Sequence, residues 1–223
     1  KLKVDFLPSG MITLFHNRSG SYISLGGVYE VKNKSTTIKE ITAKVFRQSD
    51  NATLSLIWST FPSPICRRVA GNFETSFETA HPFKVEADSL APAFVEFADK
   101  CANMDEVSNN ILYPVVCATM PIFSQSNATL PIVDGAVRAL PEYALAKIAL
   151  NDHFFWKADE YEMVITTIHS KGTFDKKYVF SLSDAESFRL RNNIDSVLIS
   201  HVANHFGIPV QVNTVAKDFK EKN

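Results

Sequence analysis

Strict two-residue alternation of apolar and polar side chains restricts the fold of this chain more than any other sequence feature. Ile41, Ala43 and Val45 alternate with polar or charged neighbours over residues 39–46. This period is typical of a strand with one buried face, because successive side chains of a strand point to opposite sides. A second alternating run covers residues 54–59, and the polar turn Gln48–Asn51 between the runs predicts an antiparallel hairpin.

Further short runs predict strands at residues 28–31, 93–97 and 112–119. Pro114 weakens the last of these predictions. Pro62 and Pro64 are expected to end the second strand of the hairpin, since proline cannot donate to a sheet ladder. Several short strands separated by turn signals are typical of a β-sandwich. The spacing of strands and turns over residues 27–61 resembles that of immunoglobulin-like modules. We therefore expect a β-rich fold, all-β to α+β, with an immunoglobulin-like β-sandwich domain over residues 1–120.

Residues 121–223 predict a smaller α+β region that follows this domain. Break signals at Pro121, Pro131 and Asp134-Gly135 mark the boundary, and Pro141 is suited to open a short helix. Alternation then predicts a β-hairpin over residues 159–182, with the loop from Ser170 to Lys176.

A helix is expected over residues 184–206. Ser183 and Glu186 have the spacing of a capping box, and Gly207 followed by Pro209 is a stop signal. Asn192-Asn193 is a weak point at which this helix can divide. Its apolar stripe, which includes Leu190, Ile194 and Leu198, should lie on the sheet. The charged tail, residues 217–223, is expected to fray.

Composition excludes several function classes. The 223 residues carry a formal net charge of −1 and are 45% apolar and 21% charged, which disfavours a disordered chain and a nucleic-acid-binding surface. No apolar stretch is long enough to cross a bilayer. The chain begins with Lys1 and not Met, so we expect a processed or truncated product from which a signal peptide or membrane anchor can have been removed. The localisation is left open.

The three cysteines are Cys66, Cys101 and Cys117, and none has the C-x-x-C spacing of a zinc or redox site. We expect buried thiols in a reducing compartment; the alternative is one disulfide and one free thiol.

Two histidines give a candidate metal site. His201 and His205 are four residues apart on the expected helix, a spacing that places both on one face, here the apolar stripe. They can hold a buried ion together or be packed as neutral imidazoles. The glutamate of H-E-x-x-H and a visible third ligand are missing, so we expect no metal and no cofactor.

A second candidate is the run from His153 to Trp156 with the following carboxylates. Trp156 beside Glu160 and Glu162 could form a sugar-stacking platform or an acid–base pair. The structural alternative is that the aromatic residues plug the core while both glutamates lie on the solvated face of a strand.

No nucleophile elbow, phosphate-binding loop or dinucleotide fingerprint is found in the sequence. The leading hypothesis is therefore a non-catalytic binding or scaffolding module that recognises a protein or another ligand through sandwich loops, notably residues 66–82. The competing hypothesis is a hydrolase-type enzyme or carbohydrate-binding domain that uses the His153–Glu162 region or the pair His201 and His205.

Overall fold

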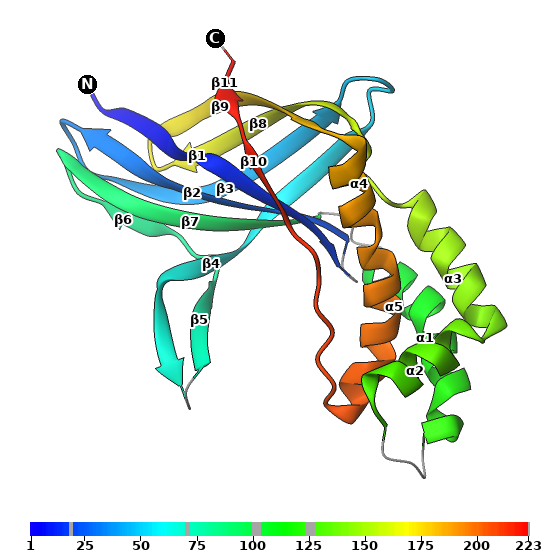
Figure 1. The fold of residues 1–223 in the computed structure, drawn as a ribbon. Coiled ribbons are helices and arrows are strands. Elements are labelled where there is room, and N and C mark those ends of the chain that lie inside the picture. Colours follow the sequence, from blue (N-terminus) through cyan, green and yellow to red (C-terminus); the bar gives the residue numbers. More distant parts are fainter. Residues whose placement is uncertain (18–19, 70–71, 100–103, 124–127, 223) are drawn as a thin grey trace.

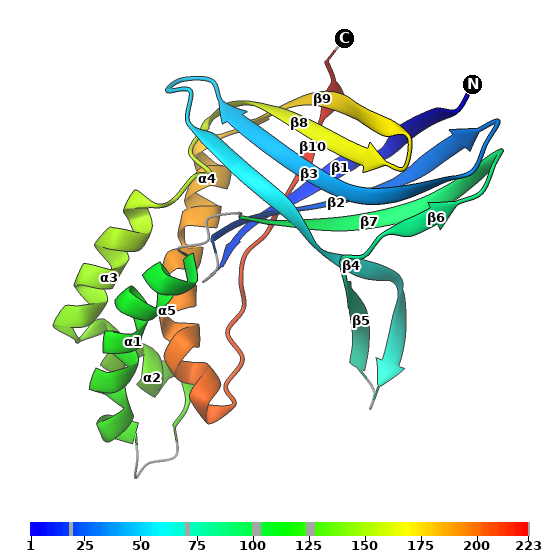
Figure 2. The ribbon, with the colours of Figure 1, turned by 180° about the vertical axis from the view of Figure 1, so that it is seen from behind.

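A computed structural model describes residues 1–17, 20–69, 72–99, 104–123 and 128–222. Its strands form one curled antiparallel sheet, and its helices gather at one end of that sheet (Figures 1 and 2). The strands are β1 (Lys3–Asn17), β2 (Gly20–Lys32), β3 (Thr36–Arg47), β4 (Thr53–Val69), β5 (Asn72–Thr79), β6 (Phe83–Val85), β7 (Ser89–Asp99), β8 (Asp159–His169), β9 (Gly172–Leu182), β10 (Val215–Asp218) and β11 (Lys220–Glu221). The helices are α1 (Met104–Phe123), α2 (Leu130–Arg138), α3 (Pro141–Asp152), α4 (Asp184–Arg191), α5 (Asn193–Ala203) and the short 3-10 helix η1 (Asn204–Phe206).

The strand order shows that the sheet is nearly closed. The order is β10-β1-β2-β7-β4-β3-β8-β9-β11, with β5 beside β4 and β6 beside β3. Its two ends, β10 and β11, are separated along the chain by Phe219 alone. The two edges of the curled sheet therefore meet at this residue.

The β-rich class is confirmed, but the immunoglobulin-like β-sandwich expected over residues 1–120 is not. Within the described ranges all strands belong to one sheet, and β8 pairs with β3 from His169 opposite Ile38 to Tyr161 opposite Arg47. Alternation shows that one face of a strand is buried; it does not show whether that face meets a second sheet or the far wall of the same sheet. The division into two domains at residue 120 stays a prediction.

Both predicted hairpins are confirmed. β3 pairs with β4 from Thr42 opposite Ile57 to Phe46 opposite Thr53, and β8 pairs with β9. The second loop is shorter than expected, because pairing continues to Gly172 opposite His169.

Two expectations about the strands are wrong, and one strand was not expected. Residues 112–119 lie in α1 and not in a strand; Leu112, Val115, Val116 and Thr119 are buried at intervals of three and four, which is helical spacing. Pro62 and Pro64 do not end β4, which continues to Val69 with an irregularity in its pairing to β5. β1 was not expected, because a bulge between Pro8 and Ile12 interrupts its alternation.

The C-terminal helical signals are confirmed. The Glu186 amide donates to Ser183 Oγ, and the Ser183 amide donates to the Glu186 carboxylate at 2.9 Å, which completes the capping box. The helix divides at Asn192 into α4 and α5, and Gly207 adopts the left-handed φ of 68° that ends η1. No helix in the described ranges is long and apolar enough to span a membrane.

Candidate functional site

Trp156 is part of the core. Its side chain is 0% exposed, its indole Nε1 donates to the Phe15 carbonyl at 3.1 Å, and its ring contacts Phe155, Tyr161 and Phe180. No face of the indole is open to a sugar, so the structure gives no support to Trp156 as a stacking platform. The structure shows the alternative considered for this run, in which the aromatic residues are packed in the core.

Glu160 and Glu162 lie on the outer face of β8, as expected for a solvated face. They differ in their partners. The Glu162 carboxylate accepts a hydrogen bond from Lys222, and this bond holds the pKa of Glu162 below its ordinary value. Glu160 is exposed and lines a hollow in the surface. The two carboxylates therefore differ in environment, although they are equivalent in the sequence pattern.

The expectation that both His201 and His205 point inward is wrong. His205 is exposed and His201 half-buried, with ring centroids 6.3 Å apart. The helix tightens to a 3-10 turn at Asn204, which rotates His205 away from the buried stripe. In the part of the chain that the structure describes, no three His, Cys, Asp or Glu side chains are placed to hold a metal ion.

Two other expectations concern residues that the structure places only in part. Cys117 is exposed, so a buried thiol is wrong at that position, while the side chains of Cys66 and Cys101 lie outside the described residues. The expected recognition loop, residues 66–82, contains much of the β4–β5 hairpin, and its side chains up to residue 77 likewise lie outside. Phe83 packs edge-on against Tyr29 and Phe61.

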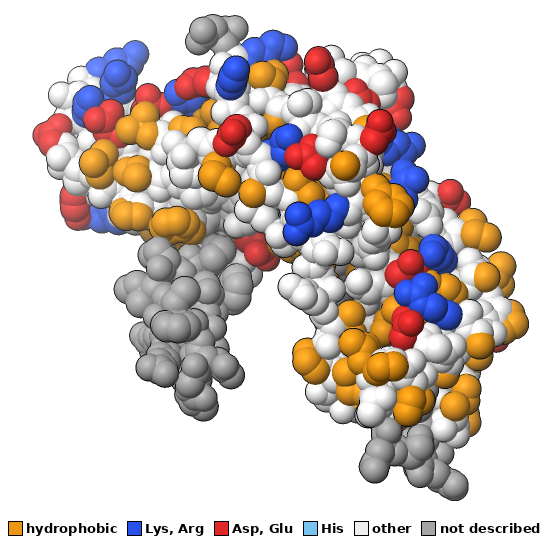
Figure 3. Space-filling model, viewed as in Figure 1, with side chains coloured by type: hydrophobic (Ala, Val, Ile, Leu, Met, Phe, Trp, Pro, Cys, Tyr) orange, Lys and Arg blue, Asp and Glu red, His pale blue; other side chains and the backbone are white. Residues whose placement is uncertain are grey.

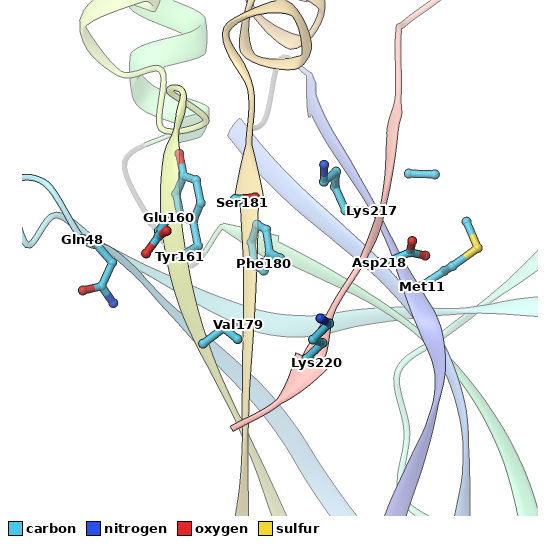
Figure 4. A pocket seen from close by; sticks show the side chains of 11 residues that line it. Met11, Gln48, Glu160, Tyr161, Val179, Phe180, Ser181, Lys217, Asp218 and Lys220 are labelled. Atoms are coloured by element: carbon cyan, nitrogen blue, oxygen red, sulfur yellow. The ribbon is translucent and has the colours of Figure 1, made fainter. Parts of the chain in front are cut away.

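The strongest candidate site is a groove at the seam where the sheet fails to close. It has a volume of about 620 Å³ and lies between β9 and the C-terminal strand (Figure 4). The two strands approach each other near Lys220 and diverge toward Ser181 and Lys217. We call this hollow the seam groove; it is lined by Met11, Gln48, Glu160, Tyr161, Val179, Phe180, Ser181, Ala216, Lys217, Asp218 and Lys220.

One wall of the seam groove is an unpaired strand edge. The Lys222 amide donates to the Lys177 carbonyl at 2.8 Å, so the main-chain groups of Lys177 face the seam. Main-chain groups alternate in direction along a strand, so those of Val179 and Ser181 face the same way. β11 pairs with Val179 and extends no further. In the described part of the chain no strand pairs with this side of Ser181, whose N–H and C=O point into the groove.

The opposite wall is also an edge. The Phe219 amide donates to the Gly10 carbonyl at 3.3 Å, so Phe219 faces β1. The same alternation turns the main-chain groups of Ala216 and Asp218 toward the groove. Each wall of the seam groove therefore presents hydrogen-bonding groups that β8 and β1 do not use.

Contacts with the helices hold β10 in this position. The Asn193 side chain is fully buried, donates to the Asn213 carbonyl and accepts from the Asn213 amide, both at 2.7 Å. Lys217 Nζ lies 2.9 Å from Glu186 Oε1 at the start of α4. These contacts attach β10 to the helices and keep it separate from β9, so the groove is built into the fold.

The charges of the seam groove are unevenly matched. Lys217 is neutralised by Glu186. Among the described residues, no ion pair involves Glu160, Asp218 or Lys220, which leaves two carboxylates against one ammonium group. Val179, Phe180 and Ala216 supply apolar surface between these charges.

A second exposed feature is apolar. Figure 3 shows hydrophobic side chains gathered over the helical part. The large exposed ones on α1 to α3 are Tyr113, Met120, Ile122, Leu130, Ile132, Leu145 and Ile148. An exposed apolar area does not by itself specify a ligand. The seam groove, which combines a volume of about 620 Å³ with unpaired main-chain groups and charged side chains, is the stronger candidate.

One buried polar side chain lies outside the groove. His16 is 1% exposed; its Nδ1 lies 3.5 Å from Ser21 Oγ and its ring contacts Phe154 edge-on. Among the residues that the structure describes, its Nε2 has no hydrogen-bond partner. Burial lowers the pKa of His16 to about 4. Its environment is that of a neutral core imidazole.

Comparison with known proteins identifies no family. No family model matches the chain, and no curated protein matches its sequence. One solved structure, a family 123 glycoside hydrolase from Clostridium perfringens studied for glycolipid glycan hydrolysis, aligns with 82% of this chain at 8% identity and a TM-score of 0.35. This chain spans 28% of the length of that enzyme. A likeness of this size carries no argument about fold or activity.

Proposed function

We propose that this protein is a non-catalytic binding module that takes an extended segment of a partner protein into the seam groove. The observation that carries the proposal is the pair of unpaired strand edges, Ser181 on β9 and Ala216 with Asp218 on β10, that face each other across the hollow. An extended segment in this groove would add a strand and bond to main chain on both sides, the mode known as β-strand addition.

The energetics favour an extended peptide over a rigid globular ligand. A main-chain hydrogen bond contributes about 0.5–1.5 kcal/mol net, so several of them along two edges are needed for useful affinity. Val179 on the outer face of β9 and Phe180 on its inner face offer apolar contacts to side chains of the segment. The groove supplies both kinds of contact.

Two expectations from the sequence stay predictions beside this one. Recognition through loop residues 66–82 is one of them. A hydrolase-type or carbohydrate-binding role for the His153–Glu162 region or for His201 and His205 is the other. No contact among the described residues favours the second role, since Trp156 is buried and Glu162 is paired with Lys222.

A substitution at Ser181 tests the proposed function. Randomised linear peptides are displayed and selected on the protein, and the bound peptide is mapped by amide chemical shifts. We expect the shifts to centre on Ser181, Ala216 and Asp218. Ser181→Pro removes the N–H that faces the groove and should weaken binding at least about tenfold, whereas Ser181→Thr keeps this N–H and should bind as the parent does.

The fold should survive Ser181→Pro, because β8 does not use that N–H and proline is tolerated on a strand edge. Unchanged circular dichroism checks this. Selected peptides that shift amides elsewhere, or that bind Ser181→Pro as well as Ser181→Thr, would refute strand addition in the seam groove.

A further inference from the structure

The chain already places a short strand of its own on the β9 edge. β11 pairs antiparallel with β9, Lys220 opposite Val179 and Glu221 opposite Tyr178. The Lys222 amide continues this pairing by donating to the Lys177 carbonyl. β11 therefore shows the direction and the main-chain contacts that a strand takes on this edge.

The side chains of this built-in strand are matched to charges on the sheet. Lys222 reaches across β9 to the Glu162 carboxylate on β8. Glu221 lies 2.8 Å from Lys176 Nζ, which also contacts Asp5 at 2.9 Å. The β11 segment is thus held by charge as well as by main-chain bonds.

Lys222 stands opposite Lys177 and reaches Glu162 diagonally, so Lys220 has the equivalent position for Glu160. Among the described residues no ion pair joins Lys220 to Glu160, which leaves this carboxylate open to a cation from a partner. Glu160 lies two residues before Glu162 on the same face of β8. On β9, Ser181 stands opposite Glu160 as Val179 stands opposite Glu162. Ser181 is short, so a long cationic side chain placed opposite it on the groove side can extend over it to Glu160.

The other charged side chains of the seam groove also favour a basic partner. Asp218 on the opposite wall adds a second carboxylate, and Lys220 is the opposing cation at the narrow end of the groove. An acidic segment would face both Glu160 and Asp218, whereas a basic segment would pair with them. Opposite charges across such a contact also steer the encounter.

We propose that the segment bound in the seam groove runs antiparallel to β9 and carries Lys or Arg in position to contact Glu160, and that β11 is the chain's own version of this interaction. This inference rests on the proposed function. It adds the polarity of the partner strand and the charge of its side chains.

Two blocked peptides test the inference on the full chain by fluorescence anisotropy, one alternating Val and Lys and one alternating Val and Glu. We expect the Val-Lys peptide to bind at least about fivefold more tightly. Glu160→Gln should weaken the Val-Lys peptide about three- to fivefold, the range of an exposed ion pair. The matched control is Glu40→Gln, an exposed glutamate on β3 outside the groove, which should have no effect.

Lys222→Ala tests the role of β11. It frees Glu162, which stands opposite Val179 and beside β11, and leaves Glu160 and the main chain of β11 unchanged. The Val-Lys peptide should therefore bind as it does to the parent protein. A change of threefold or more would show that the peptide contacts the β11 region and not Glu160, which would overturn the inference.

The outcomes separate this inference from the proposed function. If both peptides bind equally and shift the Ser181 amide, the charge preference is wrong and strand addition stands. If neither these nor the selected peptides reach Ser181, strand addition itself is wrong. Concentration-dependent dimers in sedimentation, lost in Ser181→Pro, would assign the groove to a second copy and overturn the basic partner.

Discussion

Leu198→Asp should lower the free energy of unfolding by more than about 4 kcal/mol. Leu198 is 0% exposed on α5, and Ile194 and Val202 on the same helix are also buried. A carboxylate at this position would be removed from water and placed in the apolar core. The chain should lose helical circular dichroism at a much lower urea concentration than the parent, if it folds at all.

The matched control for this experiment is Ile148→Asp. Ile148 is also a helical aliphatic residue, on α3, but it is 61% exposed. The same chemical change there should alter the free energy of unfolding by no more than about 0.5 kcal/mol. Equal urea midpoints for the two variants would show that the assigned buried face of α5 is wrong.

Acidification from pH 6.5 to about 4 should destabilise the protein by about 3 kcal/mol through His16 alone. Its pKa is lowered from 6.5 to about 4 by burial. Above pH 6.5 the imidazole is neutral in both states. Between the two values the unfolded chain binds a proton that the folded protein does not, so stability falls as the pH falls. Below about 4 both states are protonated and this contribution stops changing.

His16→Leu isolates the contribution of this residue. Urea midpoints measured from pH 4 to 7 should change much less in the variant, since leucine has no group to protonate. A shallow slope should remain, because partial burial also lowers the pKa of His169. Parallel pH profiles for parent and variant would contradict the neutral buried His16.

Local elements could be predicted from the sequence where a single periodicity ran without interruption. The β3–β4 and β8–β9 hairpins and the Ser183 capping box each rest on neighbours in sequence, and each is found. α1 was mistaken for a strand because a short apolar run fits both periods, and Pro114 inside it resembled a break.

Closure of the sheet could not be predicted in this way. The pairing of β1 with β10 joins Met11 to Asp218, and no local pattern specifies a partner at that distance along the sequence. Alternation was therefore consistent with a sandwich and with a curled sheet alike. Only the pairing of all strands distinguishes these arrangements.

The seam groove was missed for a related reason. Glu160 was singled out, but for a sugar site, because Trp156 beside it in sequence is not beside it on the surface. The other wall comes from a tail that was expected to fray. Val215 and Phe219 are buried there while Ala216 and Asp218 are exposed, and this brief alternation was the one signal of a strand in the tail.

The pairing of Met11 with Asp218 also has a consequence for how the protein is made. β10 is translated about 200 residues after β1, which needs it as a neighbour. During synthesis this edge of β1 therefore stays open to other chains until β10 has been made. Such non-local pairing slows folding and exposes edges to aggregation, so refolding yield should depend on protein concentration.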